Sequence, residues 1–215
     1  MPEKPEVITV SRKLKEKLLN KKIISCNVYY DNIIEYPSVL EFTNNIKGET
    51  FRDFTTRGKW IVMKLDHYYL LAHLRMEGKF YYRDLNCDIE KHHHVVFNID
   101  NSFELHFVDV RKFGRLKLIP ISDIYNHKPF KDMGLEYDSK ELTVSYLKEK
   151  FKNKKLPIKT ALLDQTIISG IGNIYSDEIL FLSLINPHTK CNLLNELELD
   201  SIIKNTKKVL DKAII

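Results

Sequence analysis

Cysteine, long apolar runs and an excess of one charge are all scarce in this sequence. Its three cysteines, Cys26, Cys87 and Cys191, stand far apart, and no Cys-x-x-Cys pair occurs. A disulfide framework and a cysteine-rich zinc site are therefore not expected, and no cofactor is predicted for this chain. The longest apolar runs, such as Tyr68–Ala72, fall far short of the roughly 20 residues that cross a bilayer, so no membrane partner is expected.

Charge and composition set wider limits on the class of protein. The 34 lysines and arginines exceed the 29 aspartates and glutamates and leave a net charge of +5, which permits a polyanionic partner without demanding one. Hydrophobic residues make up 43% of the chain and charged residues 29%, so the composition is globular and excludes wholesale disorder. The N-terminus has no apolar signal-peptide core, which predicts a cytoplasmic protein.

The first half of the chain has the pattern of a sheet that follows one early helix. Apolar residues recur every three or four positions from Glu6 to Leu19, which predicts a helix there. Short runs rich in β-branched and aromatic residues then alternate with breakers such as Gly58 and Gly78, a pattern that favours an antiparallel sandwich or barrel. The expected strands cover residues 24–30, 59–65, 69–74, 95–99 and 103–108.

In the last third of the chain the helical period returns. The pattern is weak and polar from Pro120 to Ser139, so we place a domain boundary there. Helices are expected from Tyr146, over Asn173–Leu184 and from Leu199 onward. The fold class predicted is α+β, with an N-terminal antiparallel β-sandwich domain with flanking helices (residues 1–120), a linker (121–138) and a C-terminal all-helical domain (139–215).

The first residues offer a nucleophile and two carboxylates. Initiator methionine is usually removed before proline, which leaves Pro2 with a secondary amine, and an α-amino group titrates near roughly pH 8. Such an amine suits attack on an electrophilic sugar carbon to give a Schiff base. Glu3 and Glu6 lie within one helical turn of each other and can handle protons. On these residues alone, the alternative that Pro-Glu merely opens a helix is favoured.

One basic turn and two loops indicate a nucleic acid. The turn Arg57-Gly58-Lys59 presents two cations that suit a phosphate. The loop after His73 carries Met76 near its tip, and the loop after Asp109 carries Phe113. An apolar side chain beside arginine at a loop tip is what a wedge into a base stack requires. Each loop alone is more typical of an ordinary hairpin, but the three features together favour DNA.

Two further motifs contain residue types that bind anions or metals. Gly170-Ile171-Gly172 precedes a predicted helix and lets backbone N–H groups approach an anion, and lysines cluster upstream between positions 148 and 159. The strand and the distant acidic residue of a dinucleotide fingerprint are missing, so a nucleotide cofactor is not expected. In His92-His93-His94 only the first and third side chains share a face of a strand, and no third ligand follows, so a metal site is not expected.

These segments occur in an order typical of one family. They are Pro2–Val7, Arg57–Lys59, His73–Gly78, Lys91–Val95, Asp109–Gly114 and Gly170–Glu178. On these motifs the chain resembles the bacterial formamidopyrimidine-DNA glycosylases over essentially all of its length. The resemblance implies a sandwich domain that carries the catalytic N-terminus and a helix–two-turn–helix domain that binds the DNA backbone. The partner would be double-stranded DNA containing oxidised purines (8-oxoguanine, formamidopyrimidines) or abasic sites, with the damaged base flipped out of the duplex.

The resemblance also implies roles for single residues. Pro2 would attack the sugar C1′ with Glu3 as acid/base, and eliminations through the Schiff base would cut the strand on both sides of the abasic site. Lys59 would be a catalytic residue that also contacts the phosphate beside the damaged nucleotide. Glu6 and Lys159 would support catalysis or contact the lesion. His73 and Asn173 would contact DNA phosphates. Met76, Arg111 and Phe113 would form a wedge that fills the space left by the flipped base.

One part of the family pattern is not found. The family continues into a zinc finger that binds one zinc ion through two Cys-x-x-Cys pairs, whereas this chain stops at Ile215. The expectation is therefore a monomeric base-excision-repair glycosylase and lyase that lacks its C-terminal zinc finger. The alternative is a truncated, catalytically impaired nucleic-acid-binding module of the same fold. A third hypothesis is a basic interaction domain with no nucleic-acid role.

Overall fold

The computed structural model describes residues 1–214, whose contacts group into two compact units. Unit 1 consists of residues 1–2, 7–56 and 60–127. Unit 2 consists of residues 3–6, residues 57–59 and the chain from Lys128 onward. The change of unit at residues 127–128 lies inside the segment predicted as a linker. That segment contains two short 3-10 helices, η2 (Ile121–Asn126) and η3 (Phe130–Asp132), and a short strand, β10 (Leu135–Glu136).

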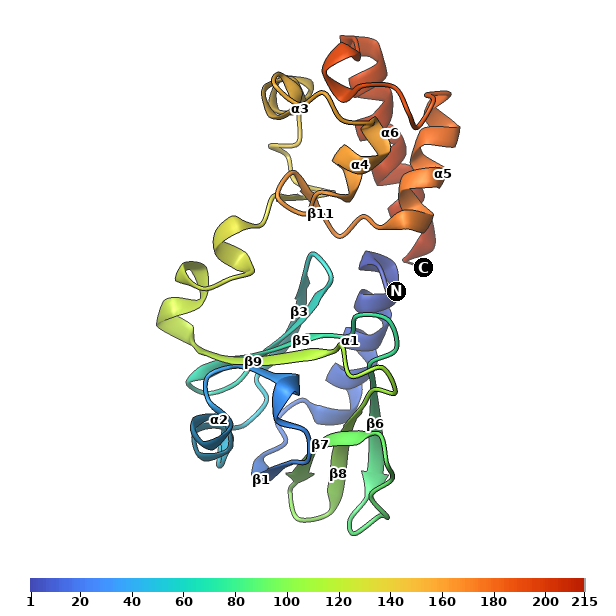
Figure 1. The fold of residues 1–215 in the computed structure, drawn as a ribbon. Coiled ribbons are helices and arrows are strands. Elements are labelled where there is room, and N and C mark those ends of the chain that lie inside the picture. Colours follow the sequence, from blue (N-terminus) through green and yellow to red (C-terminus); the bar gives the residue numbers. More distant parts are fainter. Residues whose placement is uncertain (215) are drawn as a thin grey trace. The chain divides into compact units, whose positions relative to one another are not determined.

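Unit 1 is built from two sheets that share one hydrophobic core (Figure 1). The four-stranded sheet has the order β1-β7-β8-β6 and the five-stranded sheet the order β2-β9-β5-β4-β3. Ile61 on one sheet and Phe97 and Phe107 on the other are fully buried in this core. The strands are β1 (Ile23–Val28), β2 (Ile34–Tyr36), β3 (Asp53–Arg57), β4 (Trp60–Lys64), β5 (Tyr68–His73), β6 (Lys79–Asp84), β7 (His93–Ile99), β8 (Phe103–Val108) and β9 (Arg115–Pro120).

The strand pairing confirms the expected sandwich with one exception. β4–β5, β5–β9, β6–β8, β7–β8 and β1–β7 are antiparallel. Strand β2 instead pairs with β9 in parallel, with Ile34 opposite Leu116. A three-residue strand that follows the 3-10 turn η1 (Asp31–Ile33) has too short a pattern to be recognised from the sequence.

Two helices flank these sheets. Helix α1 (Lys4–Leu18) confirms the helix predicted over residues 6–19 and buries Val7 and Leu14 on one stripe. Helix α2 (Val39–Ile46) was not predicted, although its start carries a capping box. The Ser38 hydroxyl accepts the Glu41 N–H at 3.3 Å, and the Glu41 carboxylate accepts the Ser38 N–H at 3.2 Å.

Unit 2 packs four helices around a second core and confirms the α+β class. Leu147, Leu162, Ile179 and Leu210 are buried in this core, one from each helix. The domain predicted as all-helical also contains a two-residue strand, β11 (Ile168–Ser169), which pairs in parallel with β10. None of the helices among residues 1–214 combines the length and apolar character that a membrane crossing requires. The helices are α3 (Val144–Phe151), α4 (Ile158–Leu163), α5 (Asn173–Ser183) and α6 (Glu196–Ala213), with a 3-10 turn η4 (Cys191–Leu193) before α6.

Candidate active site

The carboxylate of Glu3 lies on the first turn of helix α5, within unit 2. Its Oε2 accepts the N–H of Gly172 at 2.7 Å and that of Tyr175 at 3.3 Å, and its Oε1 accepts the N–H of Ile174 at 2.9 Å. Glu3 is only 2% exposed. Because N–H groups in a first helical turn have no partner inside the helix and lie at its positive end, they hold a carboxylate in a fixed orientation.

Gly172 makes this close approach possible. A Cβ atom at position 172 would overlap the carboxyl carbon of Glu3 and lie 2.5 Å from its Oε1. The sequence predicted an anion-binding turn at Gly170-Ile171-Gly172, and the anion found there is a side chain of the protein itself. The turn therefore positions the residue expected to act as acid/base.

Glu6 forms a second carboxylate contact beside Glu3. Its Oε2 accepts the Glu3 N–H at 2.8 Å, and its Oε1 accepts the hydroxyl of Tyr175 at 2.7 Å. Burial and the neighbouring Glu6 carboxylate raise the pKa of Tyr175, so its hydroxyl remains a proton donor. Glu6 thus fixes the backbone of Glu3 and is itself oriented by Tyr175, which the sequence analysis did not single out.

Lys59 is a buried ammonium in the same unit and is 6% exposed. Burial lowers the pKa of Lys59 below its usual value of 10.5, and the negative charge of Glu3 offsets part of that shift. A lysine with a lowered pKa gives up its proton more readily than an exposed one. This environment suits proton transfer as well as contact with a phosphate.

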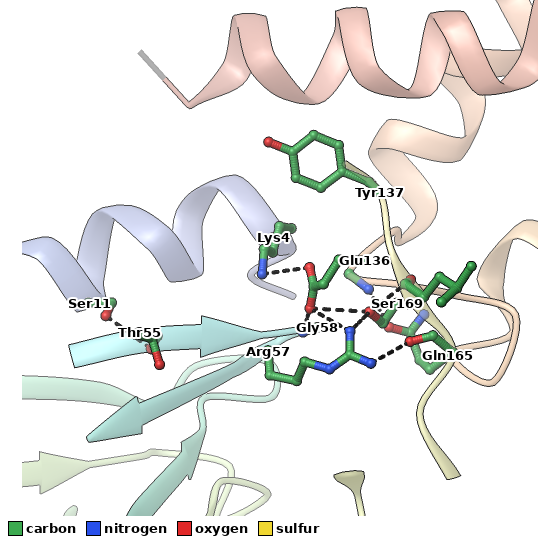
Figure 2. A network of polar contacts seen from close by, with 12 residues as sticks. Lys4, Ser11, Thr55, Arg57, Gly58, Glu136, Tyr137, Gln165 and Ser169 are labelled. Atoms are coloured by element: carbon green, nitrogen blue, oxygen red, sulfur yellow. Dashed lines mark hydrogen bonds and ion pairs between the residues drawn. The ribbon is translucent and has the colours of Figure 1, made fainter. Parts of the chain in front are cut away.

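The turn before Lys59 is held by Glu136, which the sequence analysis placed in a linker. Figure 2 shows the side chains of Lys4 and Arg57 pointing toward the Glu136 carboxylate from different segments. The Lys4 ammonium lies 2.8 Å from Oε2, and the Arg57 guanidinium lies 3.0 Å from Oε1. The N–H of Gly58 donates to the same Oε1 at 2.6 Å. No local motif marks Glu136, because its partners lie about 80 to 130 positions away along the chain.

Two further predicted residues belong to the helices of unit 2. Asn173 is exposed at the first position of α5, next to the Glu3 contacts. Lys159 on α4 forms an ion pair with Asp177 on α5 at 2.7 Å, with its side chain 32% exposed. Unit 2 therefore brings together five of the predicted residues: Glu3, Glu6, Lys59, Lys159 and Asn173.

The other predicted residues belong to unit 1, together with Pro2, the half-buried neighbour of Glu3 in sequence. His73 ends strand β5 and is 7% exposed. Its Nδ1 accepts the N–H of Arg75 at 3.0 Å, and its ring packs edge-to-face on Trp60 with centroids 4.9 Å apart. Met76, in the turn that follows, is 43% exposed, as the wedge prediction requires.

The loop from Asp109 to Gly114 is organised by its own first residue. The buried Asp109 carboxylate accepts the N–H of Arg111 at 2.9 Å and that of Gly114 at 2.7 Å. The guanidinium of Arg111 lies 4.9 Å from the centroid of the Phe113 ring, which is 46% exposed. The loop thus presents an arginine–aromatic pair to solvent.

Comparison with known proteins identifies the family of this chain. The family model described as "Formamidopyrimidine-DNA glycosylase N-terminal domain" matches residues 1–116, and that described as "Formamidopyrimidine-DNA glycosylase H2TH domain" matches residues 133–215. The chain belongs to the formamidopyrimidine-DNA glycosylase family. It is 40% identical over 215 residues to the Oceanobacillus iheyensis formamidopyrimidine-DNA glycosylase and 39% identical to that of Bacillus subtilis. The whole chain matches 77% and 78% of these two relatives.

Solved structures of this family share the fold. The complex of Lactococcus lactis Fpg with DNA containing an abasic site superposes with a TM-score of 0.92 at 33% identity. The match covers 99% of this chain and 78% of that one. A complex of the same glycosylase with a THF-DNA and an inhibitor gives a TM-score of 0.93. The resemblance inferred from the motifs is confirmed.

Two rings of the histidine triplet, those of His93 and His94, have polar partners within unit 1. The ring of His94 contacts the backbone carbonyl of Asp109 at 2.7 Å, at the base of the arginine–aromatic loop. The Nδ1 atom of His93 lies 2.9 Å from that of His106, and the Nε2 atom of His106 lies 2.8 Å from the Glu104 carboxylate. The described residues contain no group of three or more side chains arranged to hold a metal ion.

Proposed function

We propose that this chain is a monomeric, cytoplasmic base-excision-repair enzyme that removes oxidised purines from double-stranded DNA and then cuts the strand at the abasic site. The observation that carries the proposal is the buried Glu3 carboxylate, held by three backbone N–H groups of α5. It directly follows Pro2, which supplies a secondary amine once Met1 is removed. Membership of a family whose curated relatives are named glycosylases supports the assignment.

In the proposed reaction the Pro2 nitrogen attacks C1′ of the damaged nucleotide, and the bond from C1′ to the base breaks. The base leaves with the bonding electrons and takes up a proton. Glu3 takes the proton of the attacking amine and passes it to O4′, so the sugar ring opens and an iminium links Pro2 to C1′. Loss of a C2′ proton expels the 3′ phosphate, a second elimination expels the 5′ phosphate, and hydrolysis releases the amine. This chemistry uses the chain's own groups and no cofactor.

The supporting residues take the roles that the family resemblance implies, and their environments are compatible with those roles. Lys59, with its lowered pKa, serves proton transfer and contacts the phosphate next to the lesion. Glu6 orients Glu3 through its backbone N–H. The exposed Asn173 contacts phosphate and Lys159 contacts the lesion. The wedge that fills the vacated stack comes from the exposed side chains of Met76, Arg111 and Phe113, with His73 as a further phosphate contact.

Borohydride trapping tests the covalent step. Incubation with an 8-oxoguanine duplex and borohydride should give a covalent protein–DNA adduct, because reduction fixes the iminium. Glu3→Gln should abolish trapping, and Pro2→Gly should remove the secondary amine and strongly reduce it. Glu16→Gln, the same change at an exposed position of α1, is the matched control and should trap as the wild type does.

The outcome that would overturn the proposal is the absence of any adduct from folded wild-type protein with either an 8-oxoguanine or an abasic-site duplex. Salt-dependent binding that does not distinguish damaged from undamaged duplex would then favour the catalytically impaired binding module.

A further inference from the structure

We propose that Glu136 is a positioning residue of the glycosylase reaction. By holding Lys4 and Arg57, it fixes the backbone segments that carry the acid Glu3 and the amine Lys59. This inference rests on the proposed function, since it assigns a task to residues around the same site. Its basis is the convergence of two catalytic segments, residues 3–6 and 57–59, on a single carboxylate of β10.

The Glu136 carboxylate contacts polar groups from three separate segments. Oε2 takes the Lys4 ammonium, while Oε1 takes the Arg57 guanidinium and the Gly58 N–H, with the Ser169 hydroxyl 3.3 Å away. Burial of the carboxyl group disfavours its ionised form, but the Lys4 ammonium and the other donors outweigh this and hold the pKa of Glu136 below its usual value of 4.5. The Glu136 carboxylate is therefore ionised and lies between the Lys4 and Arg57 cations.

Lys4 is anchored at both ends, and it follows the acid. Its ammonium is held by Glu136 with the side chain 6% exposed, and its N–H donates to the Gly170 carbonyl at 3.1 Å. Glu3 therefore lies between two fixed points, its own carboxylate on α5 and the anchored residue 4. Without the Glu136 contact, the buried Lys4 ammonium would have to leave its site and would pull on the backbone of Glu3.

Gly58 connects the same carboxylate to Lys59. Its φ of +55° lies in the left-handed region, and its N–H is the donor that Glu136 accepts at 2.6 Å. Arg57 adds a second attachment, because its Nη2 donates to the Gly134 carbonyl at 2.7 Å. The turn that presents Lys59 is thus held through the Arg57 guanidinium and through the N–H of Gly58.

Stability alone explains this arrangement poorly. Burying an ion pair costs desolvation energy that roughly cancels its attraction, so apolar side chains would stabilise the same volume as well. A fixed geometry is different, because catalysis is sensitive to displacements of about 1 Å, which can cost on the order of 100-fold in rate. Two cations sharing one carboxylate fix the distance between the segments that carry Glu3 and Lys59.

The test measures single-turnover base excision from an 8-oxoguanine duplex at saturating enzyme, together with the enzyme concentration that gives half the maximal rate. Glu136→Gln keeps an oxygen for the Gly58 N–H but turns an amide toward Lys4. We expect its saturating rate to fall at least 10-fold while the half-saturating concentration changes less than 2-fold. Glu141→Gln, the same change at an exposed position of unit 2, should leave both values unchanged.

Lys4→Met keeps the proposal falsifiable if Glu136→Gln does not fold. Methionine fills the volume of the buried lysine stem and leaves Glu136 paired with Arg57, and we expect a rate loss of about 3- to 10-fold. In the double variant the two losses should not multiply, because both act on one contact. Saturating rates within 2-fold of wild type for both single variants would overturn the inference. An inactive wild type that binds DNA would instead overturn the proposed function.

Discussion

Two buried carboxylates, Asp109 in unit 1 and Glu3 in unit 2, are held in the same way by partners at very different distances along the chain. Asp109 accepts N–H groups from residues 111 and 114, within its own loop. Glu3 accepts N–H groups from residues 172, 174 and 175, at the other end of the chain. The first arrangement shapes a surface loop. The second places an acid on helix α5, and the residues around Glu3 give no sign of that contact.

The Asp109 contacts depend only on their own loop, whereas the Glu3 contacts depend on segments that are far apart along the chain. The Asp109 contacts lie within one six-residue loop, so their loss should destabilise unit 1 and leave the Glu3 contacts of unit 2 intact. The Glu3 contact exists only when α1 and α5 are both formed. Changes at the Glu3 contact should therefore affect chemistry more than stability, and changes at Asp109 the reverse.

The largest effect is expected from Gly172→Ala. The added Cβ would overlap the Glu3 carboxyl group, and because the flexible side chain gives way before the helix does, the acid is displaced. We expect the single-turnover excision rate to fall by about 100-fold or more, with a change in melting temperature of only a few degrees. A rate close to that of wild type would show that the orientation of Glu3 on α5 is not required.

The next effect concerns Asp109→Asn. The amide can accept only one of the two N–H groups and directs its own NH₂ toward the other, so a buried donor is left unpaired. We expect a loss of about 1–3 kcal/mol in the free energy of unfolding of unit 1, read from urea unfolding followed by the fluorescence of Trp60, the chain's single tryptophan. Asp88→Asn, at an exposed position of unit 1, is the control and should leave the midpoint in place. An unchanged midpoint for the Asp109 variant would contradict the comparison.

The two units should lose stability at different pH values as the solution is made acidic. Burial and the neighbouring His106 lower the pKa of His93 below 6.5, so the unfolded chain binds this proton first and unit 1 loses stability as the pH falls below about 6.5. The pKa of Glu136 is held below 4.5, so its contribution to unit 2 is complete above about pH 4.5 and is lost only as the pH falls further. Trp60 fluorescence should therefore show acid destabilisation of unit 1 at a higher pH than the main loss of helical circular dichroism, because most of the helical residues belong to α3, α4, α5 and α6 of unit 2. His93→Asn should shift the fluorescence transition to lower pH, and coincident transitions in wild type would refute this ordering.

The smallest effect is expected at the far end of α5. Leu184 ends this helix in the left-handed region, with φ 55° and ψ 37°, and its side chain is 91% exposed. Leu184→Gly should therefore relieve backbone strain without loss of burial and stabilise the protein by about 1 kcal/mol, with excision unchanged. Leu193→Gly, at another exposed leucine with an ordinary backbone, should destabilise instead. Destabilisation by both changes would show that the Leu184 backbone is not strained.

Much of the fold followed from patterns that are local in the sequence. The stripe that includes Val7 and Leu14 predicts α1, and alternating runs predict β4, β5, β7 and β8, because a helix or strand shows its period within about ten residues. Strands β3, β6 and β9 were not predicted either, and the short strand β2 with its parallel pairing to β9 was missed because three residues carry no period. Helix α2 was missed although Ser38 and Glu41 form a capping box that the sequence displays.

The site divides in the same manner. Pro2, Glu3 and the glycine turn at 170–172 are short motifs with a chemical meaning of their own, so the sequence singles them out as candidates. Glu136 and Tyr175 act only through partners about 80 to 170 positions away, and no spacing rule connects such residues. Glu136 also lies in a polar stretch that has the composition of a linker, which concealed its role.

The grouping of residues 3–6 and 57–59 with the helices has a practical consequence for anyone who divides this protein. A cut after His127 would not yield two complete modules, because the C-terminal piece would lack the acid, the buried lysine and both cations that surround Glu136. Its first turn of α5 would expose the N–H groups of Gly172 and Ile174 to water. Complementation of the two fragments, with recovery of activity only on mixing, is the behaviour that this interleaved chain path favours.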